Sequence, residues 1–227
     1  MRIGDRSMTK TAHETGAEDP TRERLLDAAE RLFAEKGYDA TSVREITQAA
    51  HCNIAAVNYH FGGKDNLYLQ VFQRRLDALR RLRTGRLQQA MEEAGDGATV
   101  ELVVATFTAS FLEPLVDESE GRMIMELMAR EMLDPHLPRR VLFETMIDPV
   151  QESLASALRR VVPGLGAEDA ELCVQSIVGQ LVHVFHHARL RHGTDAPSWP
   201  AAELDRMARH ITRFSAAGVL AVAGGDP

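Results

Sequence analysis

Cysteine is nearly absent from this chain of 227 residues, which contains only Cys52 and Cys173. Two cysteines cannot build a disulfide framework or a cysteine-ligated zinc cage. The sequence also lacks the run of about 20 apolar residues that a membrane-spanning helix needs, and its N-terminus lacks the apolar core of a secretory signal. These absences predict a cytoplasmic protein with no membrane segment.

Positive charge is in the minority, because 26 Lys and Arg stand against 33 Asp and Glu and give a formal net charge of −7. This balance argues against indiscriminate coating of nucleic acid but leaves room for a local DNA-binding face. Hydrophobic residues make up 44% of the chain, which is typical of a globular protein. The length is sufficient for one or two domains with a sizeable core.

Alternation of polar and apolar residues between hairpin turns is missing throughout, so the sequence predicts an all-α protein. Apolar residues instead recur at intervals of three and four. The predicted helices cover residues 21–36, 42–51, 54–60, 64–93, 99–112, 120–133, 138–161, 167–192 and 200–222. Pro149 lies inside the seventh of these and predicts a kink or a split near Ile147.

Two capping signals lie close together near residue 50. Ser42 is followed three residues later by Glu45, which is the form of a capping box at a helix N-terminus. Asn53 is a good N-cap for the short helix 54–60. Three helices within a few tens of residues, the last two separated by a tight joint, follow the helix-turn-helix plan.

The short helix must be held by its apolar side, because a helix of this length is marginal alone. Val57 and Phe61 are predicted to supply that side. The outward face is then predicted to consist of Ile54, Ala55, Ala56, Asn58, Tyr59 and His60.

This outward face has the chemistry of a DNA-reading helix. Ala55 and Ala56 are small enough to sit deep in the major groove, where their methyl groups can contact thymine methyls. Asn58 can donate and accept hydrogen bonds at a base edge, whereas Tyr59 and His60 can reach phosphates. The alternative for Tyr59 and His60 is a surface pair that merely finishes a helix.

The stretch 21–67 resembles the DNA-binding domain of the tetracycline-repressor (TetR) family of transcription regulators. The matching segments, in family order and at family spacing, are Arg24–Ala29, Leu32–Tyr38, Ala40–Ile46 and Tyr59–Leu67. The sequence of residues 58–62, together with that of the helix end at 126–134, resembles the CecR-type subgroup.

The resemblance implies a homodimeric repressor that a small-molecule effector releases from a palindromic operator. It implies a DNA-binding domain over 20–66 and an effector-binding and dimerisation domain over 67–227, while the few large apolar residues of 1–19 predict a flexible arm. No catalytic motif is present in the sequence, so no enzymatic activity and no cofactor are predicted. The DNA contacts carried over by position are Thr41, Ser42, Arg44, Asn53, Ala55, Ala56, Asn58, Tyr59, His60 and Lys64. The alternative function is a helical small-molecule-binding or adaptor protein without DNA-binding activity.

Three positions depart from the family pattern. His51 stands where the family usually has Gly, which predicts either a different cap or mild backbone strain in the turn. Cys52 stands where Val is usual. Ile54 and Ala55 leave little hydrogen-bonding capacity at the first base-facing position, so the operator sequence stays open.

The two C-terminal helices are the predicted dimer interface. Residues 167–192 are apolar on more than one side, so that helix must be covered twice. The helix 200–222 is its natural partner within the chain. The resemblance implies that both pair with their two-fold mates in a four-helix bundle.

An effector pocket is predicted among the middle helices, where thioethers and aromatic rings recur. Its candidate lining residues are Phe107, Phe111, Met123, Met128, Phe143, Met146 and His183, although an ordinary core is the alternative for each. The polar residues Glu126, Arg130 and Glu131 are predicted either to orient a ligand or to form a solvated face.

Two further clusters are assigned no ligand. His183, His186 and His187 share a helix face at spacings that suit a metal, but no carboxylate flanks them at ligand spacing, so no metal is predicted. The arginines of residues 74–86 are predicted to form a solvated basic face.

Overall fold

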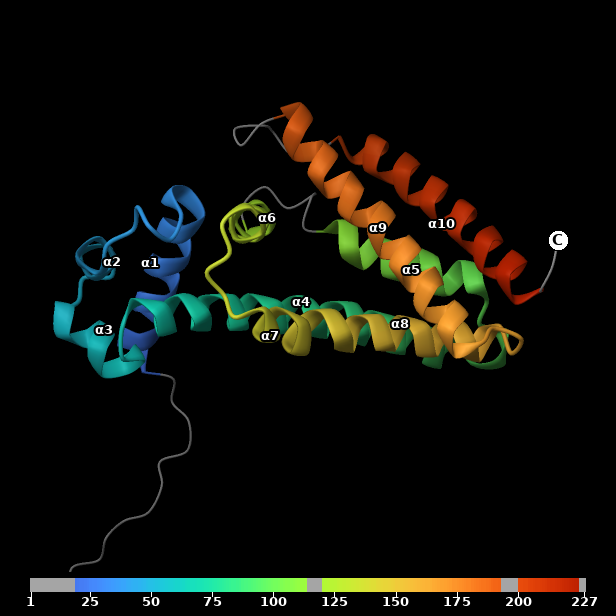
Figure 1. The fold of residues 1–227 in the computed structure, drawn as a ribbon, viewed down its shortest axis with the longest axis horizontal. Coiled ribbons are helices and arrows are strands. Elements are labelled where there is room, and N and C mark those ends of the chain that lie inside the picture. Colours follow the sequence, from blue (N-terminus) through green and yellow to red (C-terminus); the bar gives the residue numbers. More distant parts are fainter. Residues whose placement is uncertain (1–18, 114–119, 193–199, 225–227) are drawn as a thin grey trace, which may run out of the picture.

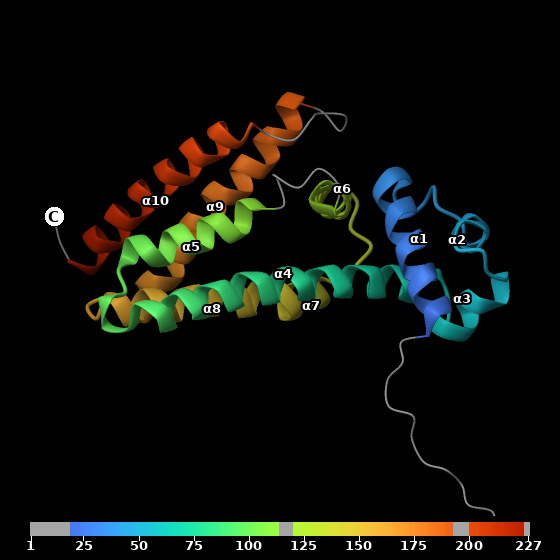
Figure 2. The ribbon, with the colours of Figure 1, turned by 180° about the vertical axis from the view of Figure 1, so that it is seen from behind.

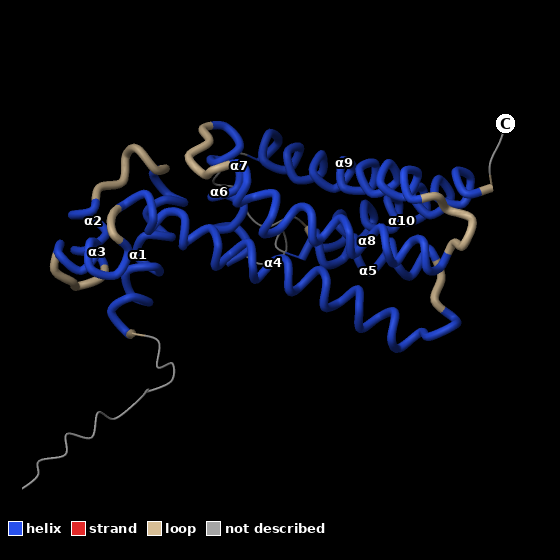
Figure 3. Tube along the Cα trace, turned by 60° about the horizontal axis from the view of Figure 1, so that its bottom comes forward, coloured by secondary structure: helices blue, strands red, loops and turns tan. Residues whose placement is uncertain are grey.

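The computed structural model describes residues 19–113, 120–192 and 200–224. Every regular element in these ranges is a helix (Figure 3), which confirms the all-α prediction. The helices are α1 (Pro20–Lys36), α2 (Val43–Ala49), α3 (Ile54–Phe61), α4 (Lys64–Ala94), α5 (Val100–Leu112), α6 (Glu120–Leu133), α7 (Arg139–Leu142), α8 (Asp148–Val161), α9 (Ala167–His192) and α10 (Ala201–Ala223). A 3₁₀ turn (Gly95–Gly97) follows α4, and a π-helical segment (Phe143–Ile147) joins α7 to α8.

The long helix α4 runs through the molecule and carries a different group of helices at each end (Figures 1 and 2). Helices α1–α3 gather around its N-terminal end. Helices α5, α8, α9 and α10 lie at its other end, where α9 and α10 contact each other along the outer side. Helix α6 lies between the two groups and contacts α1.

Helix α1 is fixed at both ends by its own sequence. The Asp19 side chain accepts a hydrogen bond from the backbone N–H of Thr21 at 2.9 Å, and Pro20 occupies the first helical position. Gly37 ends the helix at φ 84°, a conformation that favours glycine. The predicted arm over residues 1–19 lies outside the described residues, apart from Asp19.

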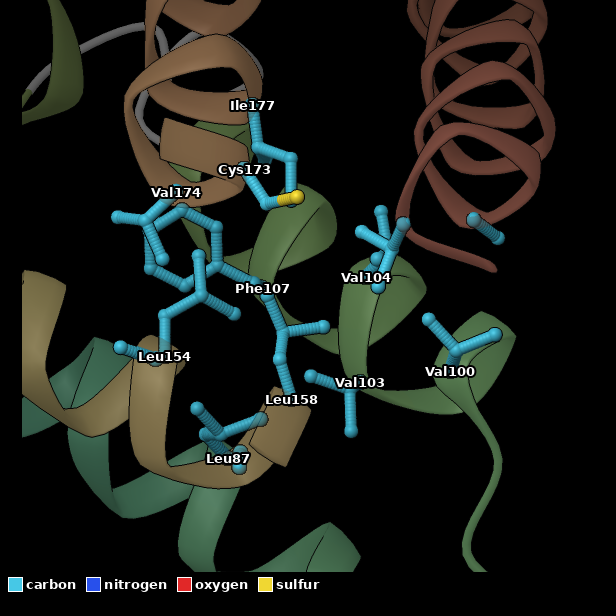
Figure 4. Packing of buried hydrophobic residues seen from close by; sticks show 14 of the residues in the cluster. Leu87, Val100, Val103, Val104, Phe107, Leu154, Leu158, Cys173, Val174 and Ile177 are labelled. Atoms are coloured by element: carbon cyan, nitrogen blue, oxygen red, sulfur yellow. The ribbon is translucent and has the colours of Figure 1, made fainter. Parts of the chain in front are cut away.

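Two separate clusters of buried side chains form the cores of the molecule. The N-terminal cluster joins α1, α2 and α3 to α4 as far as Leu76, and takes in Leu127 and Leu137 from the second half of the chain. The C-terminal cluster joins α5, α8, α9 and α10 to the end of α4. Figure 4 shows Phe107 inserted between Leu154 and Val174 in this second cluster. The N-terminal core therefore extends beyond residue 66.

The predicted interruption near Ile147 is confirmed. The backbone passes through the π-helical segment directly before α8, which has Pro149 in its first turn. Proline has no N–H to donate to the preceding turn, so the hydrogen-bond ladder changes register there.

The arginines of residues 74–86 do not form one solvated face, so that prediction is wrong. Arg74 and Arg75 both pair with Glu30 of α1, whose side chain is buried. Arg83 is buried instead, beside residues of α5 to α9. Helix α4 therefore places some of its arginines in an ion-pair cluster with α1, one in the interior, and others, such as Arg81, in solvent. No helix in the described ranges is long and apolar enough to cross a membrane.

Candidate nucleic-acid interface and effector cavity

The capping box predicted at the start of α2 is present. The backbone N–H of Glu45 donates to Ser42 Oγ at 3.2 Å, and the backbone N–H of Ser42 donates to Glu45 Oε2 at 2.9 Å. The Lys36 ammonium also bonds Glu45, at 2.8 Å. That hydrogen bond and those from Ser42 lower the pKa of Glu45 to about 2. The carboxylate thus links the start of α2 to the last residue of α1.

The turn between α2 and α3 contains the backbone strain that the sequence predicts. His51 has φ 53°, the only positive value at a non-glycine residue in the described ranges. The turn is closed by a hydrogen bond from the Cys52 backbone N–H to the Thr47 carbonyl at 2.9 Å. His51 therefore adopts the conformation for which the family position usually holds glycine.

Helix α3 is pinned at its back and open at its front. The Asn53 side chain accepts the Ala55 N–H at 3.0 Å at its start, and Gly62 ends it at φ 75°. Val57 and Phe61 are buried in the N-terminal core, as predicted. The opposite side of the helix is free to meet a partner.

The exposed residues of α3 coincide largely with the predicted reading face. Tyr59 is 84% exposed, and Ala55 and Asn58 are also exposed. Ile54, which is 51% exposed, adds an apolar contact at the start of the helix. Ala56 is only half-buried and packs partly against the N-terminal core.

The side chain of Thr41 does not belong to this face, so its predicted phosphate contact is wrong. Thr41 is 1% exposed, and its hydroxyl donates toward the carbonyls of Gly37 at 2.7 Å and Leu32 at 3.1 Å. Its backbone N–H donates to the Tyr38 carbonyl. Thr41 therefore ties the loop before α2 to the end of α1. Ser42 stays exposed, but its hydroxyl is engaged with Glu45.

The side chains of His60 and Lys64, both predicted to contact phosphate, are already in contact with protein. The predicted outward orientation of His60 is wrong, since its side chain is 11% exposed and its Nε2 lies 3.7 Å from Asp19. The Lys64 ammonium lies 4.0 Å from the centre of the Tyr38 ring. A phosphate would have to compete with these contacts.

Two arginines near the helix-turn-helix keep their charge unpaired among the described residues. Arg44 is exposed on α2, as its predicted role requires. Arg24, which the sequence analysis did not select, lies on the first turns of α1 and reaches toward Cys52 Sγ at 3.8 Å. Its position three residues after Thr21 was the available signal, because that spacing places both on one face.

The comparisons with known proteins agree with this geometry. Residues 25–71 match the family described as bacterial regulatory proteins, tetR family. Residues 100–219, more than half of the chain, match the C-terminal domain of the HTH-type transcriptional dual regulator CecR. The chain belongs to the TetR family, with a CecR-type C-terminal domain.

Individual relatives support the assignment over different lengths. The HTH-type transcriptional dual regulator CecR of Shigella flexneri is 25% identical over 170 residues, which is 72% of this chain and 75% of that protein. The HTH-type transcriptional regulator AcrR of the same organism is 30% identical over 108 residues, so the match spans 47% of its length and 48% of this chain. A TetR-family regulator from Mesorhizobium loti has the same fold, with TM-score 0.69 and 22% identity over 87% of this chain and 96% of that one.

This TetR-family protein has a cavity of about 240 Å³ lined by residues of α4 to α9. Four of the predicted lining residues are among its walls: Phe107, Phe111, Met128 and Met146. Cavity walls that the sequence analysis did not select include Arg83 and Gln151. They are far apart in the sequence and carry no shared pattern.

The other three predicted lining residues are not among the walls of this cavity. Met123 faces the N-terminal core, and Phe143 is 46% exposed. His183 instead lines a groove between α9 and α10. Periodicity places all three on helices near the cavity, but only tertiary packing decides which side of each helix meets it.

The polar residues of α6 connect it to the N-terminal half rather than to a ligand. Arg130 donates to the carbonyls of Ala34 at 2.8 Å and Glu35 at 2.6 Å, where the last turn of α1 leaves acceptors unpaired. Glu131 is buried and accepts the Tyr68 hydroxyl at 2.8 Å. Neither alternative predicted for Arg130 and Glu131 describes this role.

The histidines of α9 and a second group of possible metal ligands lie in different parts of the molecule. The ring centres of His183 and His187 are 5.9 Å apart, and the side chain of His186 lies outside the described residues. In the described ranges, the group of possible metal ligands with the required closeness is instead Asp39, Asp134 and His136. These lie at the contact between the loop after α1 and the loop after α6.

Proposed function

We propose that this TetR-family protein is a homodimeric repressor that binds a palindromic operator and is released by a small-molecule effector. Helix α3 enters the major groove in this proposal, with Ala55 and Asn58 at base edges and Tyr59 on the phosphate backbone. The remaining contacts come from the exposed Arg44, from Lys64 and from the amide of Asn53.

The observation that carries the proposal is the division of α3 into two sides. Val57 and Phe61 hold the helix against the N-terminal core, whereas Tyr59 is 84% exposed on the opposite side. A buried apolar back and a small, polar front suit a helix that approaches a groove. The same exposure favours DNA binding over an adaptor that keeps this motif only for packing.

Dimerisation is proposed through α9 and α10. Leu172, Phe214 and Val222 are large, exposed apolar residues, and all three line one groove between these helices. An apolar surface of this kind is typical of a protein interface. A two-fold dimer would present two α3 helices to half-sites roughly 34 Å apart, one turn of DNA.

The experiment for DNA binding starts from duplexes selected out of random sequence by the wild-type protein. Tyr59→Ala is expected to weaken binding roughly tenfold per half-site, since a hydrogen bond to a charged phosphate contributes about 1.5 kcal/mol. Arg44→Ala is expected to reduce the salt slope by about 1 per half-site, because one phosphate contact is lost. Arg31→Ala, an exposed arginine of α1, is the matched control. Unchanged binding by both test variants would remove α3 and α2 from the interface.

The experiment for the dimer is sedimentation of the free protein. Phe214→Glu is expected to yield monomers, because a carboxylate cannot be buried at an apolar interface without a partner. Phe143→Glu places the same charge on an exposed apolar residue outside α9 and α10, and is expected to leave the dimer intact. A dimer that survives Phe214→Glu would place the interface elsewhere.

A further inference from the structure

One charged side chain lies among the otherwise mostly apolar walls of the cavity. Its described walls are apolar except for two residues, Arg83 of α4 and Gln151 of α8. Arg83 is 7% exposed, and it is the one charged residue on these walls. The side chain that decides which ligands fit electrostatically is therefore a cation.

Arg83 lacks the partner that a buried guanidinium normally has. Its Nη1 points to the sulfur of Met146 at 3.9 Å, and a thioether is a weak acceptor. Its guanidinium carbon lies 4.0 Å from the centre of the Phe111 ring, and its Nε has no hydrogen-bond partner in the described part of the chain. Burial lowers the pKa of this guanidinium to about 10, so it remains charged at neutral pH.

Burial of an unpaired cation costs free energy of desolvation unless an anion pairs with it. The other arginines of this helix with described partners show the contrast, because Arg74 pairs with Asp27 at 2.9 Å and Arg86 with Glu113 at 2.7 Å. Met128 and Phe107 on neighbouring helices supply the apolar walls around Arg83. The cavity thus offers one charged anchor beside a hydrophobic body.

We propose that this cavity binds an amphipathic carboxylate, whose head pairs with Arg83 and whose apolar body lies against Phe107, Phe111 and Met128. The planar fork of a guanidinium matches a carboxylate in two parallel hydrogen bonds. A cavity of about 150 Å³ holds benzene, so 240 Å³ accommodates a body of about ten carbon atoms. Binding of a carboxylate to this cavity does not depend on the proposed function. Only the role of that carboxylate as the effector rests on it.

Calorimetric titration of the full-length protein without DNA tests the proposal with three probes of equal length: decanoate, decanol and decylammonium. Decanoate is expected to bind about tenfold or more tightly than decanol, since only its head gains charge-assisted hydrogen bonds. Decylammonium is expected to bind more weakly than decanol. Equal affinities for decanoate and decanol, including no binding of either, would overturn the proposal.

Substitution of the anchor provides the second test. Arg83→Met keeps a long apolar side chain and is expected to abolish the preference for decanoate while decanol still binds. Arg83→Lys keeps the charge and is expected to retain part of the preference. Arg81→Met, an exposed arginine on the same helix, is the matched control and is expected to behave as the wild type. A preference that survives in Arg83→Met would refute the assignment.

The role as effector is measured separately, by operator retention with and without decanoate. Binding of decanoate that depends on Arg83 but leaves operator affinity unchanged would refute effector release and keep the assignment of the cavity.

Discussion

The phenol of Tyr68 offers a quantitative test of how the two halves of the molecule are joined. Its hydroxyl donates to Glu131 Oε2 at 2.8 Å, and both residues are buried, so the bond links α4 to α6. Burial raises the pKa of Tyr68, and the neighbouring carboxylate raises it further. The phenol therefore stays protonated and acts as donor across the stable pH range of the protein.

The substitution Tyr68→Phe removes this bond and keeps the packing of the ring. Hydrogen bonds to charged groups contribute about 1.5–3 kcal/mol to stability. The carboxylate of Glu131 keeps two other donors, the backbone N–H groups of His136 at 3.0 Å and Leu137 at 2.7 Å. It therefore still accepts hydrogen bonds in the variant. The free energy of unfolding is therefore expected to fall by about 2 kcal/mol.

Tyr38 provides the matched control, because its hydroxyl also donates to a carboxylate, that of Asp65, at an exposed site. Burial of the ring and this bond raise the pKa of Tyr38 to about 12, so it too stays a donor. Tyr38→Phe is expected to cost less than about 1 kcal/mol, since water replaces the lost bond. Urea unfolding followed by circular dichroism measures both values. The protein concentration is kept fixed, because the apparent stability of a dimer depends on it.

A double-mutant cycle with Glu131→Gln isolates the bond itself. In the Glu131→Gln background, Tyr68→Phe is expected to cost clearly less than in the wild type, since the charged acceptor is already gone. Equal costs in the two backgrounds, or a cost for Tyr38→Phe as large as that for Tyr68→Phe, would contradict the argument that burial sets the strength of this contact.

Three further predictions concern the N-terminal domain. His51→Gly is expected to raise the free energy of unfolding by up to about 1 kcal/mol, because glycine adopts positive φ without strain; a lower urea midpoint would contradict this. Glu45 has a pKa of about 2, lowered from the usual 4.5, so its contribution to stability is present above pH 4.5 and is lost as the pH falls toward 2. Carboxyl NMR is expected to show that midpoint, and Lys36→Gln to raise it. Glu30→Gln is expected to cost about 2 kcal/mol, because it removes the buried charge that accepts hydrogen bonds from two arginines of α4, and urea unfolding measures it.

The helices and their ends were predictable because their signals are local. A capping box needs only Ser42 and Glu45 three residues apart, and the N-cap of α3 needs only Asn53 before an apolar turn. The back of α3 followed from Val57 and Phe61 at a spacing of four. The family motif at residues 59–67 lies on this same local framework, which is why the DNA-binding domain could be recognised from sequence.

The roles of individual polar residues were not predictable, because they depend on contacts distant in sequence. Arg75 and Arg83 both belong to the basic segment of α4, yet the first meets Glu30 of α1 and the second closes a cavity. Thr41 precedes α2 as a phosphate-binding residue would, but it folds under the end of α1. Spacing along one helix cannot distinguish these environments, because the partner is supplied by another helix.

The same distant contacts bear on how an effector could act. Helix α6 lines the cavity with Met128, and two residues later Arg130 holds the carbonyls of Ala34 and Glu35 on α1. A tenfold loss of operator affinity requires a difference of about 1.4 kcal/mol between the bound and free conformations. One hydrogen bond from a charged group contributes about 1.5–3 kcal/mol. If the ligand favours a position of α6 in which Arg130 loses one of its two bonds, that change alone suffices energetically, and neither domain has to unfold.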